Sequence, residues 1–277
     1  VVALKFGLHP DRERVIAQFR ERLKKDLYSI KCGFVGAPLL CTVLAECGET
    51  ELAYDYLLKE GFPGWLYEVD LGATTIWERW NSVGEDGVIS DTGMNSLNHY
   101  AYGSVMEFVY AYAAGIRPAE PGYKRAVIEP RPDIRLPKMA ASYDSVQGKY
   151  AVAYELREDG SVHMEIEVPF DCTAEVTLPR DPEGKRELSA GSYTFDYAPE
   201  RSFRKPYGER TPLSRLAKDP GAMEILGKYV PVAAGMAASG DPENGTNTLP
   251  ELMGMSFLPI DPEKMKEAIA EIRELCV

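Results

Sequence analysis

The sequence gathers its three tryptophans and several carboxylates in one segment. Trp65, Trp77 and Trp80 lie within 16 residues of one another. The acidic residues around them are Glu68, Asp70, Glu78, Glu85, Asp86 and Asp91. Aromatic faces bind the apolar C–H faces of a pyranose, and carboxylates bind hydroxyl groups or move protons. The segment from Gly61 to Tyr102 is therefore a candidate sugar site, although composition alone favours a pair of packed helices with tryptophans in their core and solvated acids.

Glu78 has the most distinctive neighbours of these acids. It lies between Trp77 and Trp80, and next to Arg79, in the run GATTIWERW. Apolar walls would favour the neutral carboxyl, whereas the guanidinium of Arg79 would favour the ionised form if the two groups met. An ionised carboxylate beside aromatic walls suits a general base that acts on water. The residues alone leave two interpretations of Glu78 open, such a base or a solvated carboxylate at a helix end, and by themselves they favour the second.

A second polar run, NSLNHYAYG, begins at Asn95. It opens a predicted helix over residues 96–114, whose apolar stripe is Leu97, Ala101, Val105, Phe108 and Tyr112. Asn98, His99 and Tyr102 could project from the start of this helix into a cleft. A single histidine such as His99 is also often a hydrogen-bonded structural residue.

Helices are predicted before and around these runs. The stripe Ile16, Phe19, Leu23, Leu27 and Ile30 has helical spacing, and Asp11 is a suitable N-cap. Apolar segments over residues 38–47 and 50–57 predict two more helices, separated by Gly48. Short loops between successive helices indicate antiparallel helix hairpins.

The pattern changes at Pro118. Alternating apolar residues predict strands over residues 150–156 and 162–168, around a turn at 158–161, with further strands at 174–178 and 193–197. A small antiparallel β-sandwich is expected here. Residues 200–212 read as a linker, and Asp219-Pro220 and Asp261-Pro262 each open a predicted helix. The expected domains are residues 1–117, 118–199 and 200–277.

Composition excludes several classes of function. The net charge of −12 disfavours a nucleic-acid partner. No apolar run reaches the roughly 18 residues of a membrane span, and the first residues do not resemble a signal peptide, so a cytoplasmic location is expected. Five cysteines without a CxxC pair and three scattered histidines suggest free thiols and no metal site. No cofactor is expected.

The runs GATTIWERW, MNSLNHYAYGSVMEFVY and AAGIRPAEPGYKRAVIEPRP strongly resemble bacterial α-L-rhamnosidases. The resemblance covers about residues 1–198 and implies an inverting glycosidase. Its fold would be the last helices of an (α/α)6 barrel, an antiparallel β-sandwich and, beyond the resemblance, a small helical tail. The resemblance also implies that Glu78 is the general base, that His99 contacts the rhamnose, and that Trp77, Trp80 and Asn98 shape the sugar site.

The resemblance also indicates that one catalytic residue of the family is missing from this sequence. The general acid of the family is a glutamate in an earlier part of the barrel, which the present sequence lacks, and Glu68 or Asp70 could only be a local substitute. We therefore expect a C-terminal piece of a longer enzyme, inactive alone, whose partner is a rhamnose-containing glycoside. An exposed half-barrel also suggests homo-oligomers. The alternatives are a carbohydrate-binding or scaffold protein without catalysis, and an α/α-barrel glycosidase for another sugar.

Overall fold

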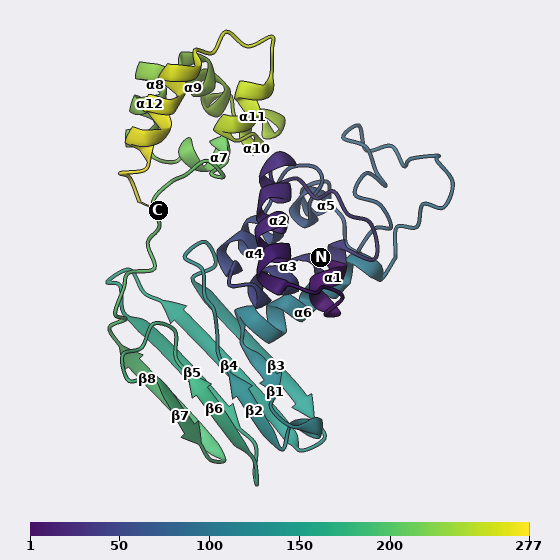
Figure 1. Ribbon diagram of the computed structural model, residues 1–277, viewed down its shortest axis with the longest axis vertical. Helices are drawn as coiled ribbons and strands as arrows, with labels where there is room; N and C mark the ends of the chain where they lie inside the picture. Colours follow the sequence, from purple (N-terminus) through teal and green to yellow (C-terminus); the bar gives the residue numbers. More distant parts are fainter. Residues whose placement is uncertain (277) are drawn as a thin grey trace. The chain divides into compact units, whose positions relative to one another are not determined.

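The computed structural model describes residues 1–276, except for the side chains of Pro242 and Glu243. Contacts divide the chain into two compact units. One contains Val1–Val43, Leu52–Ser104 and the chain from Lys205 onward, and the other contains Leu44–Glu51 and Val105–Arg204. The order of helices, a two-sheet β region and further helices confirms the predicted fold class (Figure 1). The domain boundaries given above stay a prediction.

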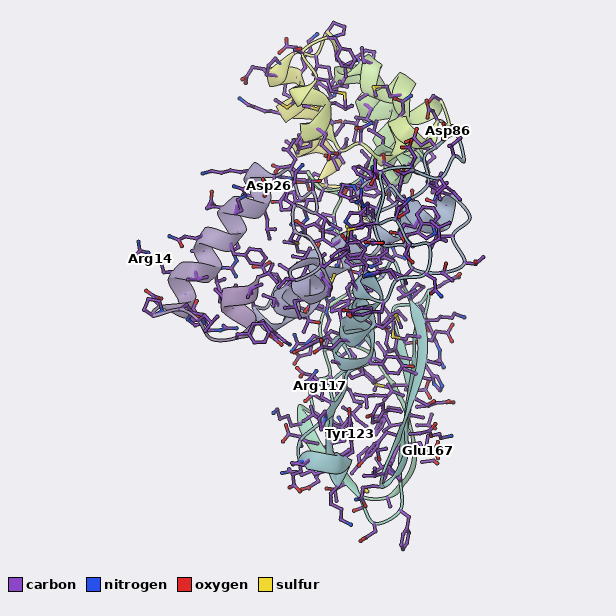
Figure 2. The ribbon with its side chains drawn as sticks, turned by 90° about the vertical axis from the view of Figure 1, so that its right-hand side faces the viewer. Arg14, Asp26, Asp86, Arg117, Tyr123 and Glu167 are labelled. Atoms are coloured by element: carbon purple, nitrogen blue, oxygen red, sulfur yellow. The ribbon has the colours of Figure 1, made fainter. Side chains whose placement is uncertain are left out.

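The first helices are short, and α2 is the longest of them. Their bounds are α1 Val2–Lys5, α2 Arg12–Lys25, α3 Ala37–Glu46, α4 Thr50–Leu57 and α5 Trp65–Asp70. Asp11 caps α2 as predicted, since its Oδ1 accepts the N–H of Arg14 at 3.0 Å. Figure 2 marks the two ends of this helix with Arg14 and Asp26. The stripe does not continue to Ile30, because Leu27 and Tyr28 have positive φ angles of 49° and 54° and end the helix.

The predicted helix over residues 96–114 is wrong over residues 96–100. The helical part consists of a 3₁₀ turn, η1, at Ala101–Val105, then α6 at Met106–Phe108 and a π-type turn, η2, at Val109–Ala113. The N–H of His99 instead donates to the carbonyl of Ile76 at 2.8 Å. The backbone of this stretch therefore pairs with an earlier segment, and its polar groups are not available to a helix.

The β region contains two four-stranded sheets (Figure 1). The first has the order β1 (Ile116–Pro118), β2 (Arg125–Ile128), β6 (Thr173–Thr177) and β7 (Lys185–Leu188). The second has the order β3 (Lys138–Ser145), β4 (Gly148–Leu156), β5 (Val162–Val168) and β8 (Gly191–Tyr197). A short 3₁₀ turn, η3 (Pro121–Tyr123), precedes β2. The expectation of a purely antiparallel sandwich is wrong at one place, since β2 and β6 run parallel.

The core of the β region follows the period-2 pattern of its strands. On β4, Tyr150, Val152 and Tyr154 are buried, while the residues between them face outward. They pack in one cluster with Met164 and Ile166 of β5 and with buried residues of β1, β2, β6 and β7. The predicted alternation over residues 150–156 and 162–168 is thus confirmed.

The C-terminal helices form a separate core with well-defined caps. Their bounds are α7 Leu213–Leu216, α8 Pro220–Tyr229, α9 Pro231–Ala238, α10 Pro242–Thr246, α11 Leu249–Gly254 and α12 Pro262–Ile272. The carboxylates of Asp219 and Asp261 accept backbone N–H groups at the starts of α8 and α12, as predicted. Leu213, Leu226 and Met265 are fully buried in this core. Arg210 forms an ion pair with Asp55 within the same compact unit.

We expect Gly115→Ala to destabilise the second unit by at least about 3 kcal/mol. Gly115 has a φ of +80°, and an added Cβ would lie 2.2 Å from the carbonyl carbon of Glu129. Gly160 has a φ of +86° but no atom within 4 Å of such a Cβ, so Gly160→Ala should cost only about 1–2 kcal/mol. Urea unfolding followed by circular dichroism compares the two variants. Equal decreases in the free energy of unfolding for Gly115→Ala and Gly160→Ala would contradict the steric argument.

Candidate active site

The residues of the predicted sugar site lie mainly on a long segment without regular helices or strands, between α5 and η1 (Figure 1). Gly72, with a φ of 83°, ends α5 and turns the chain. Two parts of the segment, residues 75–78 and 96–99, then lie alongside each other. The hydroxyl of Thr75 donates to the carbonyl of Leu97, and His99 N–H donates to Ile76. These bonds bring the two sequence motifs together.

Glu78 is held by Ser96 through two hydrogen bonds. The N–H of Glu78 donates to the carbonyl of Ser96 at 2.8 Å, and the N–H of Ser96 donates back to Oε2 of Glu78 at 2.8 Å. The Glu78 residue is 9% exposed. Its other oxygen, Oε1, makes no hydrogen bond to any residue that the structure describes. The carboxylate is therefore fixed in orientation, with one oxygen uncommitted.

Arg79 does not reach this carboxylate. Its guanidinium donates to the hydroxyl of Thr92 at 2.8 Å and to the carbonyl of Gly93 at 3.1 Å. The amide of Asn95 donates to the carbonyls of Ser82 and Ser90 at 3.0 and 2.9 Å. Both side chains therefore tie together the loop between the motifs. The guanidinium–carboxylate contact considered from the sequence is absent.

The aromatic side chains form a packed group next to Glu78. Trp77 and Trp80 are 4% and 8% exposed, so they are mostly enclosed by protein. The ring of Trp80 stacks on Tyr102 with centroids 4.0 Å apart, and Trp65 meets Trp80 edge-on at 5.1 Å. The indole N–H of Trp65 donates to the carbonyl of Tyr102 at 2.9 Å. This packing fixes the backbone on both sides of the site.

His99 and Asn98 lie at the edge of this group. Asn98 is exposed, and its backbone N–H donates to the hydroxyl of Ser96 at 3.1 Å. The imidazole of His99 stacks on Phe34 at 5.1 Å and accepts the N–H of Ala101 through Nδ1 at 3.2 Å. Sequence reasoning missed Phe34, which lies 65 residues before His99. A phenylalanine between Gly33 and Gly36 carries no sequence signal of a site residue.

Glu68 is a second buried carboxyl in this region, and it is only 2% exposed. Burial raises its pKa to about 7, while the N–H of Trp77 opposes this shift by donating to Oε2 at 3.3 Å. Its Oε1 is enclosed and has no hydrogen-bond partner among the described residues. Burial, with the nearby Glu60 as a smaller cause, also raises the pKa of the exposed Asp70.

Among the described residues, no three His, Cys, Asp or Glu side chains come together in a way that could hold a metal ion. Similarly, no helix of the described chain has the length and apolar character needed to cross a membrane.

We expect the free energy of unfolding of Glu68→Gln, relative to the native chain, to rise by about 2–3 kcal/mol between pH 4.5 and pH 8. Below the ordinary pKa of 4.5, Glu68 is protonated in both states. Between pH 4.5 and about pH 7, Glu68 loses its proton in the unfolded state but keeps it in the folded state. The unsubstituted protein therefore becomes less stable as the pH rises through this range, whereas a glutamine side chain does not titrate and avoids this loss. Urea unfolding followed by tryptophan fluorescence measures the effect.

The exposed glutamate Glu267 provides the control for this experiment. The free energy of unfolding of Glu267→Gln, relative to the unsubstituted chain, should be the same at both pH values. If that of Glu68→Gln is also the same at both pH values, the buried carboxyl is not held protonated.

Two family models match the chain. The bacterial alpha-L-rhamnosidase 6 hairpin glycosidase domain matches residues 1–113, and the bacterial alpha-L-rhamnosidase C-terminal domain matches residues 115–192. An α-L-rhamnosidase of Formosa agariphila is 34% identical over 231 residues, which cover 83% of this chain and 24% of the relative. One from an Alteromonas species is 39% identical over 210 residues, which cover 70% of this chain and 23% of the relative.

Solved structures give the same result. The α-L-rhamnosidase of Streptomyces avermitilis, complexed with L-rhamnose, matches 70% of this chain with a TM-score of 0.65 and 35% identity, and the match covers 21% of that structure. The enzyme of Aspergillus terreus matches 70% of the chain with a TM-score of 0.65 and 32% identity, over 23% of its own length. The chain thus spans about a quarter of the length of these relatives. Over the matched residues, the chain belongs to the bacterial α-L-rhamnosidase family and corresponds to a C-terminal portion of its members.

Proposed function

We propose that this chain supplies Glu78 as the general base of a glycoside hydrolase that releases terminal α-L-rhamnose with inversion. One observation carries the proposal: a nearly buried carboxylate has one oxygen fixed by the N–H of Ser96 and the other free of hydrogen bonds to the described protein. A general base needs this combination of a fixed direction and an open lone pair. The family relationship supports a sugar glycoside as the substrate class.

In the proposed reaction, Oε1 of Glu78 accepts a proton from a water molecule. The oxygen of that water forms a bond to the anomeric carbon as the bond from this carbon to the glycosidic oxygen breaks. A general acid donates a proton to the departing oxygen, so that the products are β-L-rhamnose and an alcohol. In inverting enzymes the two carboxyl groups are roughly 6.5–9.5 Å apart, which leaves space for the water.

The second carboxyl required by this reaction is not evident among the local acids. Glu68 has a pKa suited to a general acid, but its Oε1 is enclosed and its Oε2 accepts the N–H of Trp77. Asp70 is exposed to solvent. We propose that the general acid comes from outside these 277 residues and that the chain alone does not hydrolyse rhamnosides.

The remaining predicted site residues have different roles in this proposal, either binding the sugar or excluding water. His99 is partly exposed and offers one unpaired ring nitrogen, so it is the candidate for a direct hydrogen bond to the sugar. Asn98 is exposed and next to it. Trp77 and Trp80 are so enclosed that we assign them mainly to the walls that exclude water around Glu78.

We expect Glu78→Gln to reduce kcat at least about 10²-fold in the polypeptide encoded by the complete reading frame, with KM changed much less. The amide keeps the size of the side chain but cannot take a proton from water. Initial rates on an aryl α-L-rhamnoside measure the change, and proton NMR of the first sugar released identifies the anomer. Asp91→Asn, which changes an exposed acid on the same loop, should keep near-native rates.

Two results would contradict this assignment. Near-native turnover in Glu78→Gln would exclude Glu78 as the base, and α-L-rhamnose as the first product would exclude inversion. L-rhamnose binding without turnover by the complete polypeptide would instead favour a carbohydrate-binding protein.

We also expect the 277-residue chain to release no L-rhamnose from an alkyl α-L-rhamnoside above the buffer rate. The physical reason is that an alkoxide leaves only when it is protonated, and neither Glu68 nor Asp70, the acids considered among the described residues, is placed to protonate it. The Glu78→Gln chain is the matched control. Turnover that this variant abolishes would show that a general acid lies within the chain, and Glu68→Gln would then test the nearest buried candidate.

A further inference from the structure

The backbone beside His99 determines which ring nitrogen carries the proton. The N–H of Ala101 donates to Nδ1 of His99 at 3.2 Å. A ring nitrogen that accepts a hydrogen bond has no proton of its own, so the neutral imidazole must carry its proton on Nε2. Nε2 makes no hydrogen bond to any described residue, and the side chain is partly exposed. The free edge of the ring is therefore a hydrogen-bond donor.

Two aromatic rings lie nearly parallel to this imidazole. Phe34 has its centroid 5.1 Å away at an interplanar angle of 20°, and Tyr100 has its centroid 5.2 Å away at 14°. Phe34 also contacts Tyr102 at 5.5 Å, and Tyr102 stacks on Trp80. Phe34 therefore connects His99 to the packed aromatic group, whereas Tyr100 is 84% exposed and has little other support.

This stacking restricts rotation of the imidazole. A half-turn of the ring would place a C–H group against the N–H of Ala101 and would move Nε2 away from its present position. Phe34 opposes such motion because its own ring is held against Tyr102. Phe34 is nevertheless 45% exposed, so burial of this side chain alone gives little reason for a phenyl ring here.

The geometry points to Phe34 as a positioning residue, which holds the imidazole of His99 so that Nε2–H is presented as a neutral hydrogen-bond donor. The ligand part of this inference rests on the proposed function: the acceptor is a hydroxyl oxygen of L-rhamnose. Phe34 itself acts through His99 rather than by touching the reacting atoms.

The first test needs no sugar. Long-range proton–nitrogen NMR spectra of the 277-residue chain report which nitrogen of the neutral His99 ring is protonated, and the chain has only two other histidines. We expect a protonated Nε2, an unprotonated Nδ1 and a protected Ala101 amide. Phe34→Leu should reduce this amide protection about two- to tenfold. Phe257→Leu, at a phenylalanine that is 78% exposed, should not.

The second test is a double-mutant cycle on L-rhamnose binding, measured by titration calorimetry. Phe34→Leu should weaken binding about two- to tenfold in the native chain and by less than about twofold in the His99→Ala chain, because its effect passes through His99. Urea unfolding followed by tryptophan fluorescence verifies that each variant is folded.

The outcomes separate this inference from the proposed function. A proton on Nδ1 of neutral His99, or unchanged Ala101 protection in Phe34→Leu, overturns the positioning role. Additive losses in the binding cycle overturn it as well. If the NMR results are as expected but the 277-residue chain binds no L-rhamnose, the positioning role is supported, and the assignment of a rhamnose hydroxyl as the acceptor of Nε2–H fails.

Discussion

The double hydrogen bond between Glu78 and Ser96 is the interaction on which the candidate site depends. One bond joins the two backbones, and the other uses the N–H of Ser96 to satisfy one oxygen of a nearly buried carboxylate. A buried carboxylate without a donor would be costly, so the second bond allows Glu78 to remain in its aromatic surroundings. It also brings the WERW and NHY runs together without any regular element between them.

The surroundings of this bond show how a segment without helices or strands can be well defined. Arg79 and Asn95 use their side chains to bridge the intervening loop, and Tyr102 accepts the indole N–H of Trp65. Trp80 and Tyr102 stack face to face next to these contacts. The polar groups of the site are consequently anchored by backbone N–H and carbonyl groups, and its rings by aromatic contacts. This arrangement is consistent with a site that needs fixed directions, since a displacement of about 1 Å is costly in catalysis.

The sequence allowed the order of elements and several of their ends to be predicted. The strands around residues 150–168 follow from alternation, and α8 and α12 begin where Asp-Pro pairs provide a cap and a first-turn proline. The helix predicted from Ser96 failed because its spacing carries no information on the partner, Ile76, that takes the N–H of His99. The parallel pairing of β2 with β6 was missed for the same reason, since it is a long-range choice.

For the site residues too, long-range contacts could not be predicted from the sequence. Glu78, His99 and the tryptophans could be proposed as site residues because their types and local spacing are distinctive. Phe34 was not found, because its importance comes from a ring contact across 65 residues, and a phenylalanine between glycines carries no such signal. The special position of Glu68 also became visible only with its burial, since its sequence neighbours resemble those of any exposed helical glutamate.

The parallel pairing of β2 with β6 has a consequence for chain synthesis. β3, β4 and β5 are neighbours in both sequence and sheet, so this meander can form as soon as they leave the ribosome. The other sheet consists only of β1 and β2 until Thr173 and the residues after it arrive, and a two-stranded ribbon is marginal in water. The edge of β2 that pairs with β6 therefore stays unpaired while β3, β4 and β5, three of the four strands of the other sheet, are translated, which leaves that edge open to wrong pairing in a nascent chain.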